Sequence, residues 1–190
     1  MTAPPELSEQ DRLALLDAAR SSIHAGLVHR RLVAPVDDAD SPPLRAPGAS
    51  FVTLRREERL LGCIGTIEPV RPLLADVAHN AYGAAFGDPR LPPVTRDDYH
   101  RMTVKVSVLG GLEPMEAASR EALTEQLRPG VDGLLVTAGH RRGTFLPSVW
   151  EQLPDRGRFL DLLWDKAGLR PGEWPPNLRI FRYRTVEFGE

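Results

Sequence analysis

The chain has 190 residues, 42% of them hydrophobic, which is enough for one substantial core and short for two independent ones. Its 24 Lys and Arg residues and 26 Asp and Glu residues give a net charge of -2, so no basic excess favours binding to nucleic acid. The N-terminus lacks a basic segment followed by an apolar one, and no apolar run approaches the ~20 residues that a membrane helix needs. We therefore expect one compact cytoplasmic domain over residues 1–190, with no nucleic-acid or membrane partner.

The first half of the chain contains two strongly patterned helices. Ser8 followed by Asp11 is typical of a capping box, and apolar residues then recur at helical spacing. A second apolar stripe follows Pro72, which suits a first helical turn. The patterns predict a helix over 9–31, a proline-rich surface loop over 36–50, a hairpin of strands 51–54 and 59–66, and a helix over 72–86.

The second half of the chain alternates short strands with short helices. Val104, Val106 and Val108 alternate with polar residues, as in a strand covered on one face. The patterns predict a strand over 102–108, a helix over 119–127, a hairpin of strands 134–138 and 144–146, a helix over 155–167 and a strand over 178–188. Two hairpins without regular βαβ alternation indicate an α+β fold, in which helices flank an antiparallel or mixed sheet and the domain has two lobes.

Cys63 is the only cysteine and the leading candidate for a functional side chain. A lone thiol forms no internal disulfide and no paired-thiolate zinc site, so we expect a reducing compartment, no metal and no cofactor. Gly62 and Gly65 flank it, and glycines inside a strand mark places where a ligand or another backbone comes close. The alternative interpretation is that Cys63 is a small buried hydrophobe.

A nucleophilic thiol needs a base, and His79 is the best placed of the five histidines. It lies on the predicted helix 72–86, away from the apolar stripe, and Asp76 three residues earlier is within reach to orient the imidazole. The hypothesis is a triad of Cys63, His79 and Asp76, with Asn80 as an alternative orienting group. His140, at the tip of the second hairpin, is the rival base, and a solvated polar helix face is the alternative explanation.

Asp88 and Arg90 follow the same helix. Asp88 suits an Asx turn, and the planar guanidinium of Arg90 suits a carboxylate or phosphate. Together with Gly62, Gly65 and Asn80, these two residues form the predicted binding set for a small-molecule ligand.

Several segments resemble the AMMECR domain family, whose bacterial members are labelled AmmeMemoRadiSam system protein A. The resemblance covers about residues 50–188, and its segments are Phe51-Val52-Thr53-Leu54, Leu60-Leu61-Gly62-Cys63-Ile64-Gly65-Thr66, Phe86-Gly87-Asp88-Pro89-Arg90-Leu91-Pro92-Pro93, Val106-Ser107-Val108-Leu109, Gly130-Val131-Asp132-Gly133, Thr144-Phe145-Leu146-Pro147, Val149-Trp150-Glu151, Lys166-Ala167-Gly168-Leu169 and Arg182-Tyr183. It implies a two-lobed α+β fold with an antiparallel sheet, and an association with Memo-type and radical-SAM proteins. It implies no established reaction.

The sequence departs from the family pattern at Leu61, where an arginine is usual, and at Leu91, where a phenylalanine is usual. If that arginine stabilises a thiolate or an anionic ligand, this chain has lost the donor unless Arg90 replaces it. Two functions therefore stay open. One is an enzyme that uses Cys63 on a small carbonyl or acyl substrate, and the other is a non-catalytic binding module for a Memo-type or radical-SAM partner.

Overall fold

The computed structural model describes residues 3–33 and 41–190, and the chain divides into two compact units. The first, which we call the N-terminal unit, comprises Pro5–Leu109 and Val186–Glu190. The second, which we call the C-terminal unit, is built mainly from Gly110–Thr185. Helices and antiparallel sheets segregate in both, so the predicted α+β fold is confirmed.

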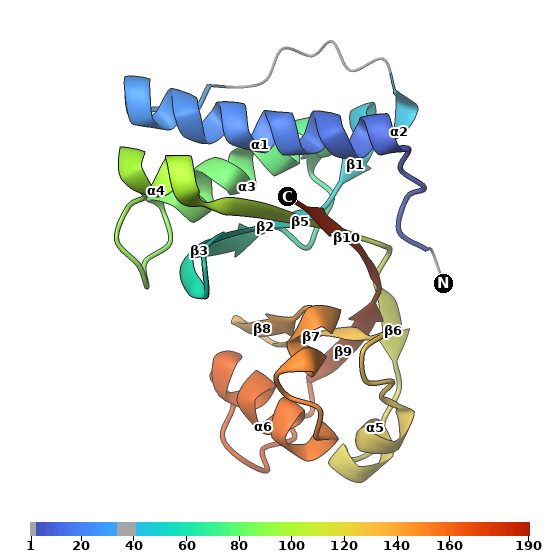
Figure 1. Cartoon of the computed structure of the whole chain (residues 1–190). Helices are drawn as coiled ribbons and strands as arrows, with labels where there is room; N and C mark the ends of the chain where they lie inside the picture. The colour runs from blue at the N-terminus through green and yellow to red at the C-terminus, as the bar shows by residue number, and fades with distance from the viewer. Residues whose placement is uncertain (1–2, 34–40) are drawn as a thin grey trace. The chain divides into compact units, whose positions relative to one another are not determined.

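The N-terminal unit places two long helices on one face of a four-stranded sheet (Figure 1). The strand order is β10-β5-β2-β3, and a separate two-stranded sheet pairs β1 with β4. Its elements are α1 (Glu9–His29), α2 (Pro42–Arg45), β1 (Pro47–Gly48), β2 (Ser50–Arg56), β3 (Arg59–Gly65), β4 (Arg71–Pro72), α3 (Leu73–Phe86), α4 (Arg96–Arg101), β5 (Thr103–Leu109) and β10 (Thr185–Gly189).

Alternation along the strands of this sheet separates its two faces. Val52 and Leu54 on β2 and Val104 and Val106 on β5 are almost fully buried and share one core with the apolar residues of α1 and α3. Because successive strand residues point to opposite faces, the residues between them lie on the face away from these helices. The first face holds the unit together, and the second is free to carry polar side chains.

The C-terminal unit packs α5 (Arg120–Gln126) and α6 (Arg156–Lys166) against a second four-stranded sheet. The order of this sheet is β6-β9-β7-β8, from β6 (Glu113–Met115), β9 (Arg179–Tyr183), β7 (Gly133–Ala138) and β8 (Arg141–Phe145), and a 3₁₀ turn η1 (Pro147–Glu151) follows β8. Trp150 and Phe159 stack at its core with ring centroids 3.7 Å apart. The predicted hairpin of β7 and β8 and both predicted helices are confirmed.

The predicted surface loop 36–50 is wrong where it can be compared with the structure. Residues 34–40 lie outside the described part, but α2 and β1 follow, and Leu44 and Ala49 are buried. Pro42 and Pro43 sit in the first turn of α2, where the missing amide hydrogen costs nothing, so the prolines that suggested a loop instead begin a helix.

Two other elements differ from the prediction. The predicted last strand 178–188 is two strands, β9 and β10, which belong to different sheets. The short helix α4 was missed, although Thr95 and Asp98 form the same capping box as Ser8 and Asp11. The remaining predicted elements are confirmed with ends shifted by no more than two residues, except that β8 begins at Arg141, three residues before its predicted start.

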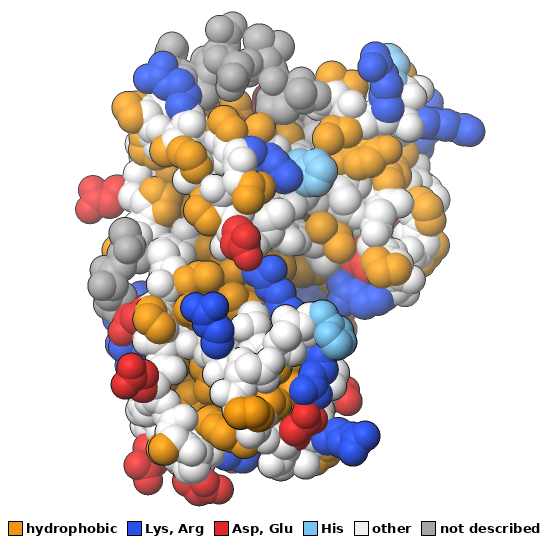
Figure 2. Space-filling model, turned by 180° about the vertical axis from the view of Figure 1, so that it is seen from behind, with side chains coloured by type: hydrophobic (Ala, Val, Ile, Leu, Met, Phe, Trp, Pro, Cys, Tyr) orange, Lys and Arg blue, Asp and Glu red, His pale blue; other side chains and the backbone are white. Residues whose placement is uncertain are grey.

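Charges are mixed on the molecular surface. On the face shown in Figure 2, Lys and Arg side chains are interspersed with Asp, Glu and hydrophobic side chains. Within the described residues, no helix combines the length and apolar character needed to cross a membrane.

Candidate functional site

Cys63 lies on β3, the outermost strand of its sheet, opposite Thr53 on β2. Its neighbours Gly62 and Ile64 both face α3, since they approach the backbone of Ala84 and Gly83. The side chain of Cys63 therefore projects from the other face of the sheet, where it is partly exposed.

The main-chain polar groups of Cys63 point outward from the sheet edge and are held by two side chains. Its N–H donates to Asp88 Oδ2 over 3.0 Å, and its carbonyl oxygen accepts from a terminal nitrogen of Arg90 over 3.1 Å. Asp88 and Arg90 thus take the place of a neighbouring strand, and we call this pair the edge latch. An edge strand covered in this way is protected against unwanted pairing.

The edge latch is held together by charge. Arg90 donates to both oxygens of Asp88, over 2.8 Å from Nε and 2.6 Å from a terminal nitrogen, and the backbone N–H of Arg90 completes the predicted Asx turn. The Arg90 guanidinium, helped by the Cys63 amide, holds the pKa of the Asp88 carboxyl well below its usual range. The Asp88 side chain is 2% exposed, whereas that of Arg90 is 57% exposed. In this structure the carboxylate that Arg90 binds is that of Asp88 in the same loop.

Close packing within the protein explains why glycine occupies positions 62 and 65. A Cβ atom at Gly62 would lie 1.8 Å from the carbonyl oxygen of Ala84, so α3 packs directly on this strand. A Cβ atom at Gly65 would lie 2.2 Å from the ring of Phe51, which covers that glycine. Close approach is therefore confirmed at both positions, but the approaching groups are another backbone and an aromatic ring of the protein.

A polar row crosses all four strands on the face that carries Cys63. The hydroxyl of Thr53 donates to the Cys63 sulfur over 3.3 Å, Thr53 pairs with Lys105 on β5, and Lys105 forms an ion pair with Glu187 on β10. We call Cys63, Thr53, Lys105 and Glu187 the cross-strand row. Sequence reasoning missed the last three, although the alternation of polar and apolar residues in β2 and β5 already placed Thr53 and Lys105 away from the core.

The structure does not assemble the predicted triad. His79 is exposed on α3, which lies on the face of the sheet opposite to the Cys63 side chain. Asp76 does not share a solvated helix face with His79, because Asp76 is fully buried at 0% exposure. The rival base, His140, is exposed in the turn between β7 and β8 of the C-terminal unit.

Asp76 and Asn80 instead form a buried polar cluster at the start of α3. Asp76 accepts from Ser50 Oγ and Thr66 Oγ1, each over 2.7 Å, from Asn80 Nδ2 over 2.9 Å and from Arg71 over 3.1 Å. Asn80, 1% exposed, also donates to the Ser50 carbonyl oxygen. The cluster ties the first turn of α3 to the start of β2 and the end of β3, so both residues position the sheet edge.

Leu61, where the family arginine is expected, is the extra residue of a β-bulge. Leu54 pairs with Gly62 and Arg55 pairs with Leu60, which leaves Leu61 without a partner on β2. Its side chain is 6% exposed and packs in the core of the N-terminal unit. In this chain, position 61 therefore contributes apolar packing.

Among the described residues, no group of three or more His, Cys, Asp and Glu side chains is arranged to hold a metal ion. What the site offers chemically is a partly exposed thiol with a hydroxyl donor beside it and an ammonium group further along the row. The predicted site residues Cys63, Asp88 and Arg90 come together, while His79, Asp76 and Asn80 lie elsewhere.

The sequence and the fold are both similar to those of known proteins. The AMMECR1 family model matches residues 16–188, so the match begins well before the resemblance noted over 50–188. A protein of Methanothermobacter thermautotrophicus is 37% identical over 186 residues, which cover 97% of this chain and 96% of that protein. A protein of Thermofilum pendens is 35% identical over 196 residues, which cover 97% and 92%.

A solved structure supports the same relationship. The crystal structure of the uncharacterized protein PH0010 from Pyrococcus horikoshii matches with a TM-score of 0.85 and 32% identity, over 93% of this chain and 89% of that one. The two relatives and this structure are all archaeal. With a family match over most of its length and relatives above 30% identity, the chain belongs to the AMMECR1 family.

Proposed function

We propose that the protein is a non-catalytic binding module that presents the cross-strand row to a protein partner. The observation that carries this proposal is the edge latch: the Cys63 N–H, which an oxyanion would need, is already bound by Asp88 at 3.0 Å. The exposed imidazole of His79 lies on the wrong side of the sheet to act as a base. What remains around Cys63 is a rigid, polar, partly exposed strand surface, which suits recognition.

The partner we propose is a Memo-type or radical-SAM protein. The choice rests on the association that the sequence resemblance implies, and the cross-strand row supplies the chemistry of the contact. Its partly exposed members carry a hydroxyl, a thiol and the Lys105–Glu187 ion pair, so a complementary surface would be polar with both charge signs.

Co-purification with the Memo-type and radical-SAM proteins of the same organism tests this proposal. We expect a stable complex that survives Cys63→Ser, because the thiol contributes only part of the contact surface. Lys105→Glu should weaken the complex about tenfold or more, since like charges across an interface cost several kcal/mol. His79→Glu, an exposed change on the helix side of the same unit, is the matched control and should bind like the unmodified chain. The proposal would be overturned if none of these proteins formed a complex with the chain. It would also be overturned if Lys105→Glu and His79→Glu weakened the complex equally.

The second candidate function is an enzyme that uses Cys63 as a nucleophile on a small carbonyl or acyl substrate. The specific observation in its favour is the Thr53 hydroxyl, which points at the sulfur over 3.3 Å and would stabilise a thiolate as its hydrogen-bond donor.

This candidate predicts a different pattern of variants. With an activated acyl ester as substrate, Cys63→Ala should abolish turnover and Thr53→Val should slow it about tenfold, as loss of a hydrogen bond to a charged group does. His79→Ala should keep the full rate, because the imidazole lies across the sheet. Turnover that persists in Cys63→Ala would exclude the cysteine mechanism.

A further inference from the structure

The C-terminal unit has an open cavity of about 500 Å³ at the place where β6 and β9 separate. Met115 and Ile180 form the last pair of these two strands. Beyond that pair, one chain segment continues through residues 116–118 toward α5, while the other arrives from residues 174–178 before β9. The volume lies in the range of small-molecule sites.

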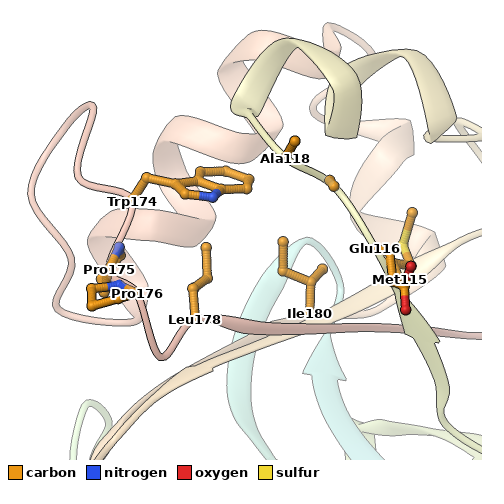
Figure 3. Close-up of a pocket in the computed structure, with 9 residues that line it drawn as sticks. Met115, Glu116, Ala118, Trp174, Pro175, Pro176, Leu178 and Ile180 are labelled. Carbon is orange, nitrogen blue, oxygen red and sulfur yellow. The ribbon is translucent and has the colours of Figure 1, made fainter.

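Eight of the nine residues that line this cavity have apolar side chains. Figure 3 shows Leu178 and Ile180 pointing into it from the start of β9, with Trp174 at one end and Met115 and Glu116 at the other. Leu178 and Ile180 also belong to the core of the C-terminal unit, so the floor of the cavity is an opening in that core. A ligand body lying there would be apolar.

Trp174 holds its end of the cavity open. Its ring stacks against Trp164, with centroids 5.8 Å apart and an interplanar angle of 19°. The backbone carbonyl of Glu173, next in the chain, accepts from the Trp164 indole nitrogen over 2.8 Å. The wall is therefore fixed before any ligand arrives, which lowers the entropic cost of binding.

Among the residues that the structure describes, Glu116 is the only charged one that lines the cavity, and it is exposed. Within the described part of the chain, its carboxylate forms no ion pair. The cavity thus combines an apolar floor, an aromatic wall at one end and an unpaired negative charge at the other. This charge pattern complements a cation and repels an anion.

We propose that this cavity binds a small organic cation with an apolar body, such as an arylalkyl or alkyl ammonium compound. The apolar body lies over Leu178 and Ile180 against Trp174, and the ammonium group meets the Glu116 carboxylate at the other end. The proposal concerns a site in the C-terminal unit and does not depend on the function proposed for Cys63.

The test is a titration with three probes of nearly equal size that differ in charge: 2-phenylethylammonium, 2-phenylethanol and 3-phenylpropionate. The three tryptophan indole N–H signals in NMR spectra report binding, and Trp174→Phe identifies the signal of Trp174. We expect the Trp174 signal to move with the cation, to move less at equal concentration with the alcohol, and to stay in place with the anion.

Variants separate the charge from the cavity. Glu116→Gln should weaken binding of the cation about three- to fivefold, as loss of an exposed ion pair does, and should leave the affinity for the alcohol unchanged. Glu151→Gln changes an exposed residue in η1 of the same unit and is the matched control. It should change the affinity for neither the cation nor the alcohol. Ala118→Phe, which fills the cavity from an exposed position, should abolish binding of both probes.

The outcomes that overturn the proposal are distinct. Equal binding of cation and alcohol, unaffected by Glu116→Gln, would mean an apolar cavity with no preference for charge. Preferential binding of the anion would show that the cavity does not select cations. Binding that survives Ala118→Phe would show that the probes bind at another site. A Trp174 signal that moves with none of the probes would also reject it.

Discussion

Asp76→Ala is expected to lower the free energy of unfolding by about 3–5 kcal/mol, the range observed when one partner of a buried charged network is removed. The carboxylate is fully buried and accepts hydrogen bonds from Ser50, Thr66, Asn80 and Arg71. Without it, the hydroxyl of Ser50 and the amide of Asn80 lose an acceptor in a place that water does not reach, and each such loss carries a desolvation cost.

Urea unfolding followed by circular dichroism measures this loss. Asp17→Ala removes an exposed carboxylate from α1 of the same unit and is the matched control, for which we expect a change within about 0.5 kcal/mol. Asp76→Asn keeps the volume but turns an amide donor toward groups that are themselves donors, so it should recover little of the loss. A decrease below about 1 kcal/mol for Asp76→Ala would show that the cluster does not hold α3 to the sheet edge.

The same residues show why helix α3 could be predicted while its polar face could not. Leu74, Val77 and Ala81 recur at helical spacing, which predicts the helix and one apolar stripe. Asp76 and Asn80 are polar, and such residues on a helix are normally solvated. They are buried here because the ends of β2 and β3 bring the hydroxyls of Ser50 and Thr66 to them, and contacts between distant segments leave no periodic signal in the sequence.

The glycines around Cys63 correctly predicted close approach, but the sequence did not say whether a ligand or another part of the chain would approach them. A strand glycine indicates close approach but does not say by what. At Gly62 the approaching group is the Ala84 carbonyl oxygen, and this choice depends on how α3 returns across the sheet. The alternation of β2 and β5, by contrast, already separated the Cys63 face from the helix face, and it would have argued against His79 as the base.

The predicted strand 178–188 was wrong because its division into two strands is set by tertiary structure. Residues 178–188 read as one strand because apolar and polar residues continue through Arg184 without a glycine or proline. The chain nevertheless crosses there from the sheet of the C-terminal unit to that of the N-terminal unit. Helix α4 is a different case, because its capping box was visible in the sequence and only its short length concealed it.

Asp88→Asn is expected to destabilise the N-terminal unit by about 2–4 kcal/mol at neutral pH, since it removes the charge from a nearly buried carboxylate that accepts from both Arg90 and the Cys63 amide. The effect should depend on pH with a definite sign. Folding lowers the pKa of Asp88, so its contribution to stability is fully present above the unfolded pKa of about 3.9 and is lost as the pH falls toward the lower folded value.

Unfolding midpoints measured at about pH 6 and about pH 2.5 distinguish the charge of the edge latch from its shape. If the charge carries the effect, the difference between Asp88→Asn and the unmodified chain shrinks at the acid end, because Asp88 itself becomes protonated as the chain unfolds there. A difference of the same size at both pH values would mean that asparagine fails for steric reasons. Asp17→Asn, which changes an exposed carboxylate, should have a stability close to that of the unmodified chain at both pH values.

Asp88→Asn should also make the Cys63 amide exchange faster with solvent hydrogen, because Asp88 is the group that accepts from this amide. This result would tie the stability of the edge latch directly to the accessibility of the strand edge at Cys63.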